Sequence, residues 1–169
     1  MTTLVEKDAC ELLDADHIAV KHLFVEYARL AFGSGEAAAA DKLALAQKIC
    51  SELTVHAQIE EEIFYPALRE VIDEPDLLDE AQAEHQEAKA MIAQIQGMAQ
   101  ADATMDAIVA ELNRAIEHHV KEERDELFTK ARSADLDLDA LGAQMQERQQ
   151  ELMAAAGTTG KPARQSRTR

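Results

Sequence analysis

The sequence predicts an all-α protein: an antiparallel, up-down bundle of four long helices followed by a short fifth helix. Hydrophobic residues make up 47% of the 169 residues, but aromatic residues make up only 4%. Strong helix formers, above all Ala and Leu, fill the chain, and runs of β-branched residues are missing. Short breaks separate long segments of helical periodicity, and long helices joined by short turns pack as antiparallel bundles.

The breaks set the bounds of each expected helix. The sequence "GSG", Gly33–Gly35, ends the first helix, and "DEPD", "ADATM" and "SADLD" separate the later ones. We expect Pro66 to kink the second helix because proline has no N–H to donate. Asp102 or Thr104 can cap the fourth helix. The expected helices span about residues 5–32, 36–70, 77–100 and 105–131, with an amphipathic fifth helix reaching about residue 155 and lying across the outside or one end of the bundle.

Length and charge indicate one domain, residues 1–155, and a disordered basic tail, residues 156–169. The net charge of −16 repels nucleic acid phosphates and anionic lipid headgroups, so we predict neither a nucleic acid nor a membrane partner. No apolar run approaches the roughly 20 residues of a membrane span. Cys10 and Cys50 form no CxxC motif, and the N-terminus lacks an export-signal pattern, which together favour the reducing cytoplasm.

Four of the six histidines fall on core-facing stripes of their helices. The first two stripes are Leu13, His17, Val20, Phe24 and Tyr27, and then Ile49, Leu53, His56, Glu60, Ile63 and Ala67. The other two are Leu78, Ala81, His85, Ala88, Ile92 and Ile95, and then Ile108, Leu112, Ile116, His119, Glu123 and Leu127. His118 shares its face with charged residues, so we set aside the overlapping pair His118/Glu122. His22 lies on a mixed strip and is interpreted as structural or exposed.

The two halves of the chain resemble each other. "DADHIAVK" at 14–21 and "QAEHQEAK" at 82–89 each open with an acid-His pair. A His followed four residues later by a Glu occurs at His56/Glu60 and at His119/Glu123, each time just ahead of a bulky pair (Phe64-Tyr65, Leu127-Phe128). This pattern indicates a helical hairpin used twice.

A single histidine in an apolar stripe is more often a hydrogen-bonded core residue than a ligand. Two buried carboxylates change that balance, because burying each one ionised costs several kcal/mol without a partner. Residues four apart on a helix lie about 6 Å apart on one face, so each His/Glu pair can offer nitrogen and oxygen to the bundle axis. Four His and two Glu are too many for one tetrahedral zinc. They suit two octahedral metal ions joined by bridging glutamates and an oxo or hydroxo group, with about two positions open.

Over about residues 10–132 the sequence resembles the hemerythrin-like, or HHE cation-binding, domain family. The segments that carry the resemblance are "DADH", "HAQIEEEIFYP", "AEHQEAK" and "HHVKEERDELF". The resemblance implies a four-helix bundle with a non-haem di-iron centre, and members that bind or sense dioxygen, sense or hold iron, or react with peroxide or nitric oxide. It implies these metal ligands: His17, His56, Glu60, His85, His119 and Glu123.

Two departures separate this chain from the oxygen-carrying members. They have a second histidine where this chain has Lys89, and their last carboxylate follows its histidine by five residues instead of four. One iron is therefore expected to be more open, or Lys89, Glu61 or a water stands in. Tyr27 or Tyr65 could support the site, although a structural role is the simpler interpretation of a buried tyrosine.

The expected function is a cytoplasmic protein with two iron ions that binds or senses dioxygen or a related small diatomic or peroxide ligand. One alternative is a di-iron enzyme acting on hydrogen peroxide or nitric oxide, although the sequence shows no separate general base and no catalytic residue is assigned. Another is an iron-storage or iron-sensing protein. The remaining alternative is a metal-free or zinc-binding helical interaction module.

Overall fold

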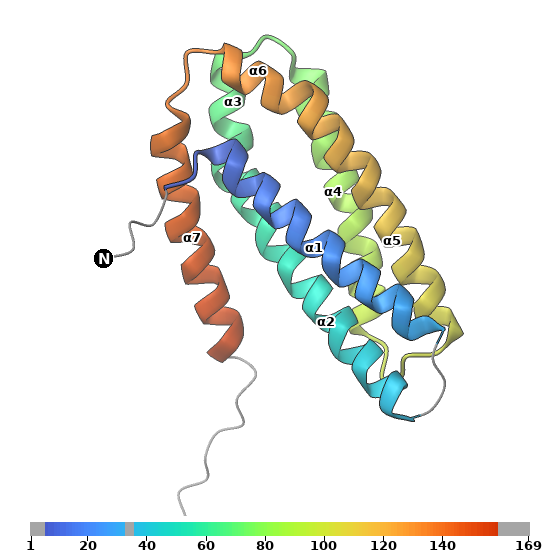
Figure 1. The fold of residues 1–169 in the computed structure, drawn as a ribbon. Helices are drawn as coiled ribbons and strands as arrows, with labels where there is room; N and C mark the ends of the chain where they lie inside the picture. Colours follow the sequence, from blue (N-terminus) through green and yellow to red (C-terminus); the bar gives the residue numbers. More distant parts are fainter. Residues whose placement is uncertain (1–5, 33–35, 159–169) are drawn as a thin grey trace, which may run out of the picture.

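The computed structural model describes residues 6–32 and 36–158, and all its regular elements are helices (Figure 1). The predicted all-α fold class is therefore confirmed. The elements are α1 (Ala9–Ala31), α2 (Glu36–Ile59), η1 (Glu60–Phe64), α3 (Tyr65–Val71), α4 (Pro75–Gln96), α5 (Ala103–Glu122), η2 (Glu123–Leu127), α6 (Phe128–Ser133) and α7 (Leu138–Thr158), where η marks a π-helical turn.

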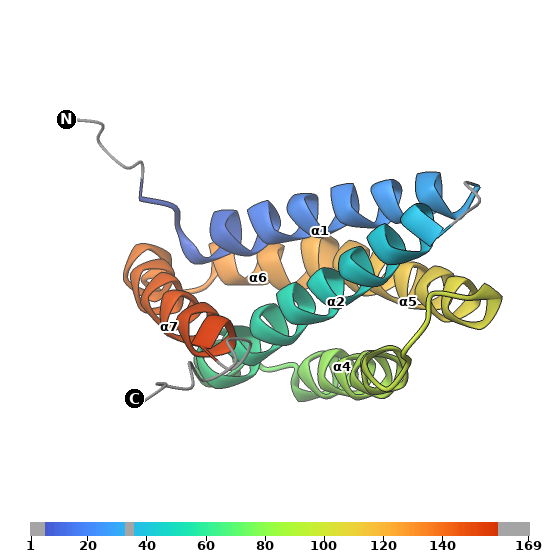
Figure 2. The ribbon, with the colours of Figure 1, turned by 90° about the horizontal axis from the view of Figure 1, so that it is seen from below.

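Four long rods form the bundle. Helices α1 and α4 are two of them, and the continuous segments α2–η1–α3 and α5–η2–α6 are the others. Each rod contacts two neighbours: α1 lies against α2 and α5, and α4 lies against the same two helices on the other side (Figures 1 and 2). The predicted four-helix bundle is confirmed. Among the described residues, no helix combines the length and apolarity needed to cross a membrane.

Side-chain caps start two of the rods. Asp8 accepts a hydrogen bond from the Glu11 amide (2.8 Å), and the Glu11 carboxylate accepts one from the Asp8 amide (3.3 Å). This reciprocal pair satisfies two amide donors that no helical carbonyl can reach. Asp102 caps α5 through the Met105 amide at 3.1 Å, so the first of the two expected capping residues is used.

A π-helical turn interrupts each glutamate-bearing rod. It begins at Glu60 in one rod and at Glu123 in the other, and the residue five positions on donates its amide to the glutamate carbonyl. Pro66 follows the first turn and lies in the first turn of α3, so the rod does not end there. The second turn forms without a proline, so proline is not what produces it.

The first π turn shifts the buried face by one position, and the predicted stripe is wrong beyond Glu60, whereas Leu127 of the second rod is buried as predicted. Ile63 and Ala67 are only partly buried. Phe64, Tyr65 and Leu68 are fully buried in their place. A π turn adds one residue to a helical turn, so every later side chain rotates relative to the 3.6-residue period.

Helix α7 lies outside the bundle against α1, α2 and η1, as the sequence predicts for the fifth helix (Figure 2). Gly142 allows its close approach: a Cβ there would lie 2.8 Å from the Asp8 carbonyl carbon and 2.9 Å from the Ala9 amide nitrogen. Met145 of α7 is fully buried. The helix continues through Thr158, beyond the expected end near Ala155, and residues 159–169 of the predicted tail lie outside the described residues.

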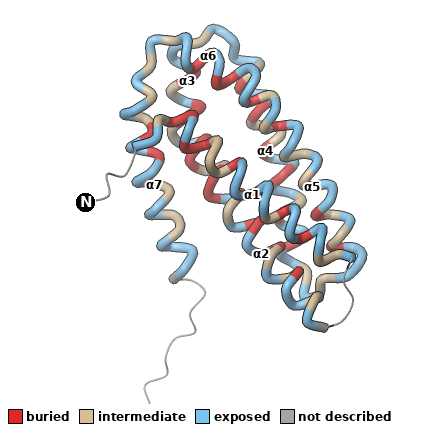
Figure 3. Tube along the Cα trace, viewed as in Figure 1, coloured by how far each residue is buried: buried red, intermediate tan, exposed pale blue. Residues whose placement is uncertain are grey.

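The core consists of two apolar clusters with a polar layer between them. One cluster gathers Phe64, Tyr65 and Phe128 at the α3/α6 end, and the other gathers residues such as Phe24 and Ile92 toward the opposite end. Buried residues run along the inner faces of all four rods (Figure 3). On each rod the histidine of the polar layer falls between the residues of the two clusters, and the layer contains the predicted metal ligands.

Candidate metal centre

The structure brings the six predicted ligands together in this polar layer. The four histidines are 5–8% exposed, Glu60 is 0% exposed and Glu123 is 1% exposed. Each rod contributes one histidine, and the two rods with π turns add one glutamate each. Ionisable side chains this deeply buried require partners, because desolvation otherwise destabilises their charged forms.

The ligand atoms form two groups of three. His17, His56 and Glu123 make up one group, and His85, His119 and Glu60 make up the other, with the ligand atoms of each group within 4.8 Å of one another. The Nε2 atoms of His17 and His56 are 3.1 Å apart, and those of His85 and His119 are 3.2 Å apart. Each histidine pair comes from one hairpin, and the glutamate comes from the opposite one.

Each glutamate also reaches the other histidine pair. Glu60 Oε1 lies 2.7 Å from His56 Nε2 and 3.5 Å from His85 Nε2. Glu123 Oε1 lies 3.1 Å from His17 Nε2, and its Oε2 lies 3.3 Å from His119 Nε2. The two carboxylates therefore span both groups, which is the arrangement that bridging ligands of a two-metal centre require.

The buried glutamate oxygens that lack a hydrogen-bond partner indicate that these side chains can bind cations. Oε1 of Glu60 and Oε1 of Glu123 are buried and have no hydrogen-bond partner among the described residues. Glu60 Oε1 lies 2.7 Å from His56 Nε2, an ion-pair contact that does not have the geometry of a hydrogen bond. No Lys or Arg of the described segments pairs with either glutamate. A divalent ion facing nitrogen and carboxylate oxygen atoms would satisfy all of them.

Two further carboxylates orient the histidines. Asp16 Oδ2 lies 3.1 Å from His56 Nδ1, and Glu84 Oε1 lies 3.0 Å from His119 Nδ1. Such a partner fixes the ring so that Nε2 faces the candidate metal position, and it would raise the basicity of the histidine as a ligand. Asp16 and Glu84 immediately precede His17 and His85. The sequence showed both acid-His pairs, but their role depends on the neighbouring rod and was missed.

Without a cation, two of the imidazoles, His56 and His119, have raised pKa values. Burial alone would lower the pKa of His119, but hydrogen bonds to Glu123 and Glu84 outweigh it and raise that pKa to about 10. Burial likewise opposes the charged form of His56, and the Glu60 carboxylate outweighs it, so the pKa of His56 is also raised. Burial would raise the pKa of Glu60, but His56 holds it below its usual value. Metal ions would therefore compete with protons for these sites.

Tyr65 lies at the centre of the candidate site. Its hydroxyl is 2.8 Å from Glu123 Oε2 and 3.0 Å from Glu60 Oε2, within donating distance of both carboxylates. Burial and then the charges of Glu123 and Glu60 raise the phenol pKa well above its usual value, so Tyr65 stays a proton donor. Tyr27, the other tyrosine considered from the sequence, is not in the site: it donates to Asp106 at 2.7 Å in the far cluster.

The remaining candidates lie around the centre. The Lys89 ammonium pairs with Glu61 at 2.7 Å, so these two possible substitutes for a ligand neutralise each other. Glu61 approaches His85 Nδ1 only to 3.8 Å. His22 is exposed, and the exposed Glu62 pairs with Arg148 of α7.

A small cavity adjoins the histidines on the side toward the second apolar cluster. Its volume is about 30 Å³, and all four histidines of the candidate centre line it. Most of its other lining is apolar, including Val20, Leu53, Ile92 and Ile116. One water needs about 10–15 Å³ of space measured in this way, so the cavity has room for about two water-sized groups.

Comparisons with known proteins agree with this geometry. The sequence matches the hemerythrin HHE cation-binding domain over residues 8–131. A solved structure of a hemerythrin HHE cation-binding domain-containing protein from Mycobacterium kansasii is similar, with a TM-score of 0.74 and 21% identity over 90% of this chain and 91% of that one. Among curated proteins, none matches the chain. The match over most of the sequence, together with the buried histidine and glutamate groups, shows that the chain belongs to the hemerythrin HHE cation-binding family.

Proposed function

We propose that His17, His56, Glu60, His85, His119 and Glu123 hold two iron ions, and that this pair binds or senses dioxygen or a related small molecule. The observation that carries the proposal is the sharing of both carboxylates between the two histidine pairs. Nitrogen and carboxylate ligands accept iron, manganese or zinc, and iron is favoured by the resemblance to hemerythrins.

The surroundings of the ligands favour a small ligand of low polarity. The histidine-lined cavity has room for a molecule of two or three heavy atoms, and its apolar walls offer few competing hydrogen bonds. When bound, an iron pair supplies open coordination positions and the capacity for electron transfer. The chain contributes six ligands, two orienting carboxylates and an apolar pocket that excludes bulk water.

The direct test is metal analysis with absorption spectroscopy on protein from iron-replete cells. We expect two irons per chain and an oxo-to-iron absorption band. Glu62→Ala is the matched control for Glu60→Ala, because Glu62 lies in the same π turn but is exposed. Fewer than two metal ions per chain and no such band in the wild-type protein would contradict the proposal.

Tyr65 favours a second candidate, an enzyme acting on hydrogen peroxide or nitric oxide. Its phenol lies within donating distance of both bridging carboxylates, where it can hold or give up a proton beside the reacting ligand. Tyr65→Phe should slow oxygen release from peroxide without loss of iron, and Tyr27→Phe serves as the control. Equal rates for both variants, or no turnover in the wild-type protein, would reject this candidate.

The same centre could also serve iron storage or iron sensing, and the remaining alternative is a metal-free or zinc-binding helical module. For a metal-free module, His56→Leu should leave the melting temperature unchanged or raise it. On our proposal this variant loses metal and melts at a lower temperature, because an ion bound only by the folded chain stabilises it.

A further inference from the structure

A third group of metal-ligating side chains lies outside the candidate centre. Glu84 of α4 and His118 and Glu122 of α5 converge, with their ligand atoms within 4.8 Å of one another. His118 Nε2 lies 3.4 Å from Glu84 Oε2 and 3.2 Å from Glu122 Oε1. The pair His118/Glu122 has the same four-residue spacing as His119/Glu123. Each of its residues comes one position earlier in the sequence, so the pair lies on the surface side of the helix.

The two separations from His118, 3.4 and 3.2 Å, suit neighbouring ligands of an octahedral cation. Ligands at about 2.0–2.2 Å from an ion and at right angles to each other lie about 3 Å apart. The imidazole nitrogen favours an ion such as Fe²⁺, Mn²⁺ or Zn²⁺ over Mg²⁺ or Ca²⁺. The side chain of His118 is 63% exposed, so water can complete the coordination.

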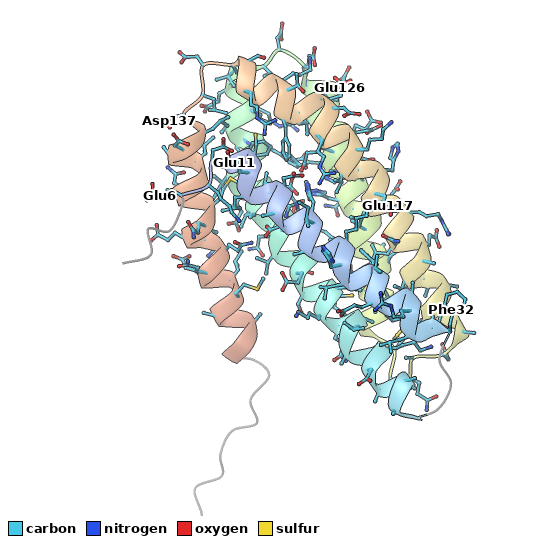
Figure 4. All side chains as sticks on the ribbon, in the orientation of Figure 1. Glu6, Glu11, Phe32, Glu117, Glu126 and Asp137 are labelled. Atoms are coloured by element: carbon cyan, nitrogen blue, oxygen red, sulfur yellow. The ribbon has the colours of Figure 1, made fainter. Side chains whose placement is uncertain are left out.

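The charge around this group attracts cations. No Lys or Arg among the described residues pairs with Glu84 or Glu122. The adjoining depression of about 400 Å³ is lined by Glu122 and by Glu80, Asp125 and Glu126, against the single cation Lys121. Figure 4 shows Glu126 on the outer side of the α5–η2 rod. A depression lined mainly by one sign of charge raises the local concentration of the opposite ion.

The group is connected to the buried centre. The second oxygen of Glu84, Oε1, is the partner of His119 Nδ1, so one carboxylate joins the outer group to an inner ligand. A cavity of about 10 Å³ lies between them, lined by Glu84, Glu122, His119 and Glu123. Glu123 is almost wholly buried, and its Oε1 has no hydrogen-bond partner among the described residues. The space of about one water beside His119 therefore separates the outer group from the buried centre, and Glu123 Oε1 itself lies toward His17 inside that centre.

We propose that Glu84, His118 and Glu122 form an outer site that binds one divalent transition-metal ion and through which metal ions are loaded into the buried centre. The loading role rests on the proposed function, namely that the inner residues bind two ions. The described residues of the opposite hairpin offer no equivalent, because Gln149 of α7 donates to both oxygens of Asp16 at 3.1 and 2.9 Å and covers that carboxylate.

The test uses the full chain, freed of metal with a chelator and titrated without oxygen with Mn²⁺ or Fe²⁺. We expect two tightly bound ions and a third, weaker one. His118→Ala and Glu122→Gln should each abolish the third equivalent and slow filling of the inner centre about tenfold, the size of effect expected from losing a charged binding site on the route. Both variants should still reach two ions per chain.

His22→Ala is the matched control, since His22 is an exposed histidine on another rod. It should keep the third equivalent and the wild-type rate. Two ions in the wild-type protein without a third would overturn the outer site, and wild-type loading rates in both outer-site variants would overturn its loading role. Fewer than two ions in the wild-type protein would instead contradict the two-metal centre, so the two failures are distinguishable.

Discussion

The α1–α2 hairpin and the α4–α5 hairpin build the same half-site but finish it differently. Each supplies an acid-His pair on one rod and a His/Glu pair with a π turn on the other. In the first hairpin the orienting carboxylate, Asp16, is covered by Gln149 of α7. In the second, Glu84 is shared with the exposed His118 and, through it, with Glu122. The comparison distinguishes two kinds of feature. The candidate metal centre needs some features in both hairpins, and other features occur in only one hairpin.

The largest expected effect concerns what the halves share. Because each glutamate reaches histidines of both hairpins, Glu60→Ala or Glu123→Ala should remove both ions, not one. Metal analysis of the purified variants measures this directly, with Glu62→Ala as control. A variant that keeps one full equivalent would show that the halves bind their ions independently.

The second prediction is that both hairpins make the stability of the metal-free protein depend on pH in the same direction. The pKa of His119 is raised from 6.5 to about 10 in the metal-free protein, and that of His56 is also raised. Because these histidines bind a proton more tightly in the folded state than in the unfolded state, protonation stabilises the fold. This stabilisation is complete below pH 6.5 and is lost as the pH rises toward 10. Chelator-treated protein should therefore lose unfolding free energy between pH 6.5 and 10 in urea titrations.

Metal-loaded protein should not show this loss, because its imidazoles are already neutral ligands. His119→Asn should reduce the slope of the metal-free protein. A metal-free stability that stays constant or rises over this pH range would contradict the protonation states inferred for the site.

The third prediction compares the two orienting carboxylates. Asp16→Asn and Glu84→Gln should each weaken metal binding in the inner centre about 10- to 100-fold in chelator competition, because each loosens one histidine. Only Glu84→Gln should also remove the outer ion. If Asp16→Asn removed it as well, the asserted difference between the hairpins would be wrong.

The smallest effect should come from removing the contact between Gln149 of α7 and Asp16. Gln149→Ala removes the one amide nitrogen that donates to both oxygens of Asp16, and a total loss of about 1 kcal/mol should lower inner affinity by about fivefold. Gln150→Ala, at an exposed neighbouring position, is the control. No difference between the two variants would mean that α7 does not help to orient His56.

The same comparison shows what the sequence could predict. The four rods and the inward placement of His17, His56, His85 and His119 followed from helical periodicity, because long amphipathic helices leave one face to bury. The π turns did not follow, since a constant period of 3.6 residues takes no account of an inserted residue. The visible signal was the bulky pair after each His/Glu motif, which places Tyr65 and Phe128 five residues after the glutamates.

Other parts of the site depend on contacts between rods. Asp16 and Glu84 were visible as acid-His pairs, but each acts on a histidine of the adjacent helix. His118 was set aside because its own helical face is charged, and its partner Glu84 comes from α4. Periodicity within one helix shows which way a side chain points, and it carries no information on which residue of the next helix it meets.

The central claim is that both carboxylates join two ions into one centre. The most direct measurement combines iron content with electron paramagnetic resonance on the oxidised protein after gel filtration removes weakly bound metal. Bridged ferric ions couple antiferromagnetically, so we predict two irons per chain and almost no ferric signal. One iron per chain, or two irons with the full signal of isolated ferric ions, would contradict a shared centre.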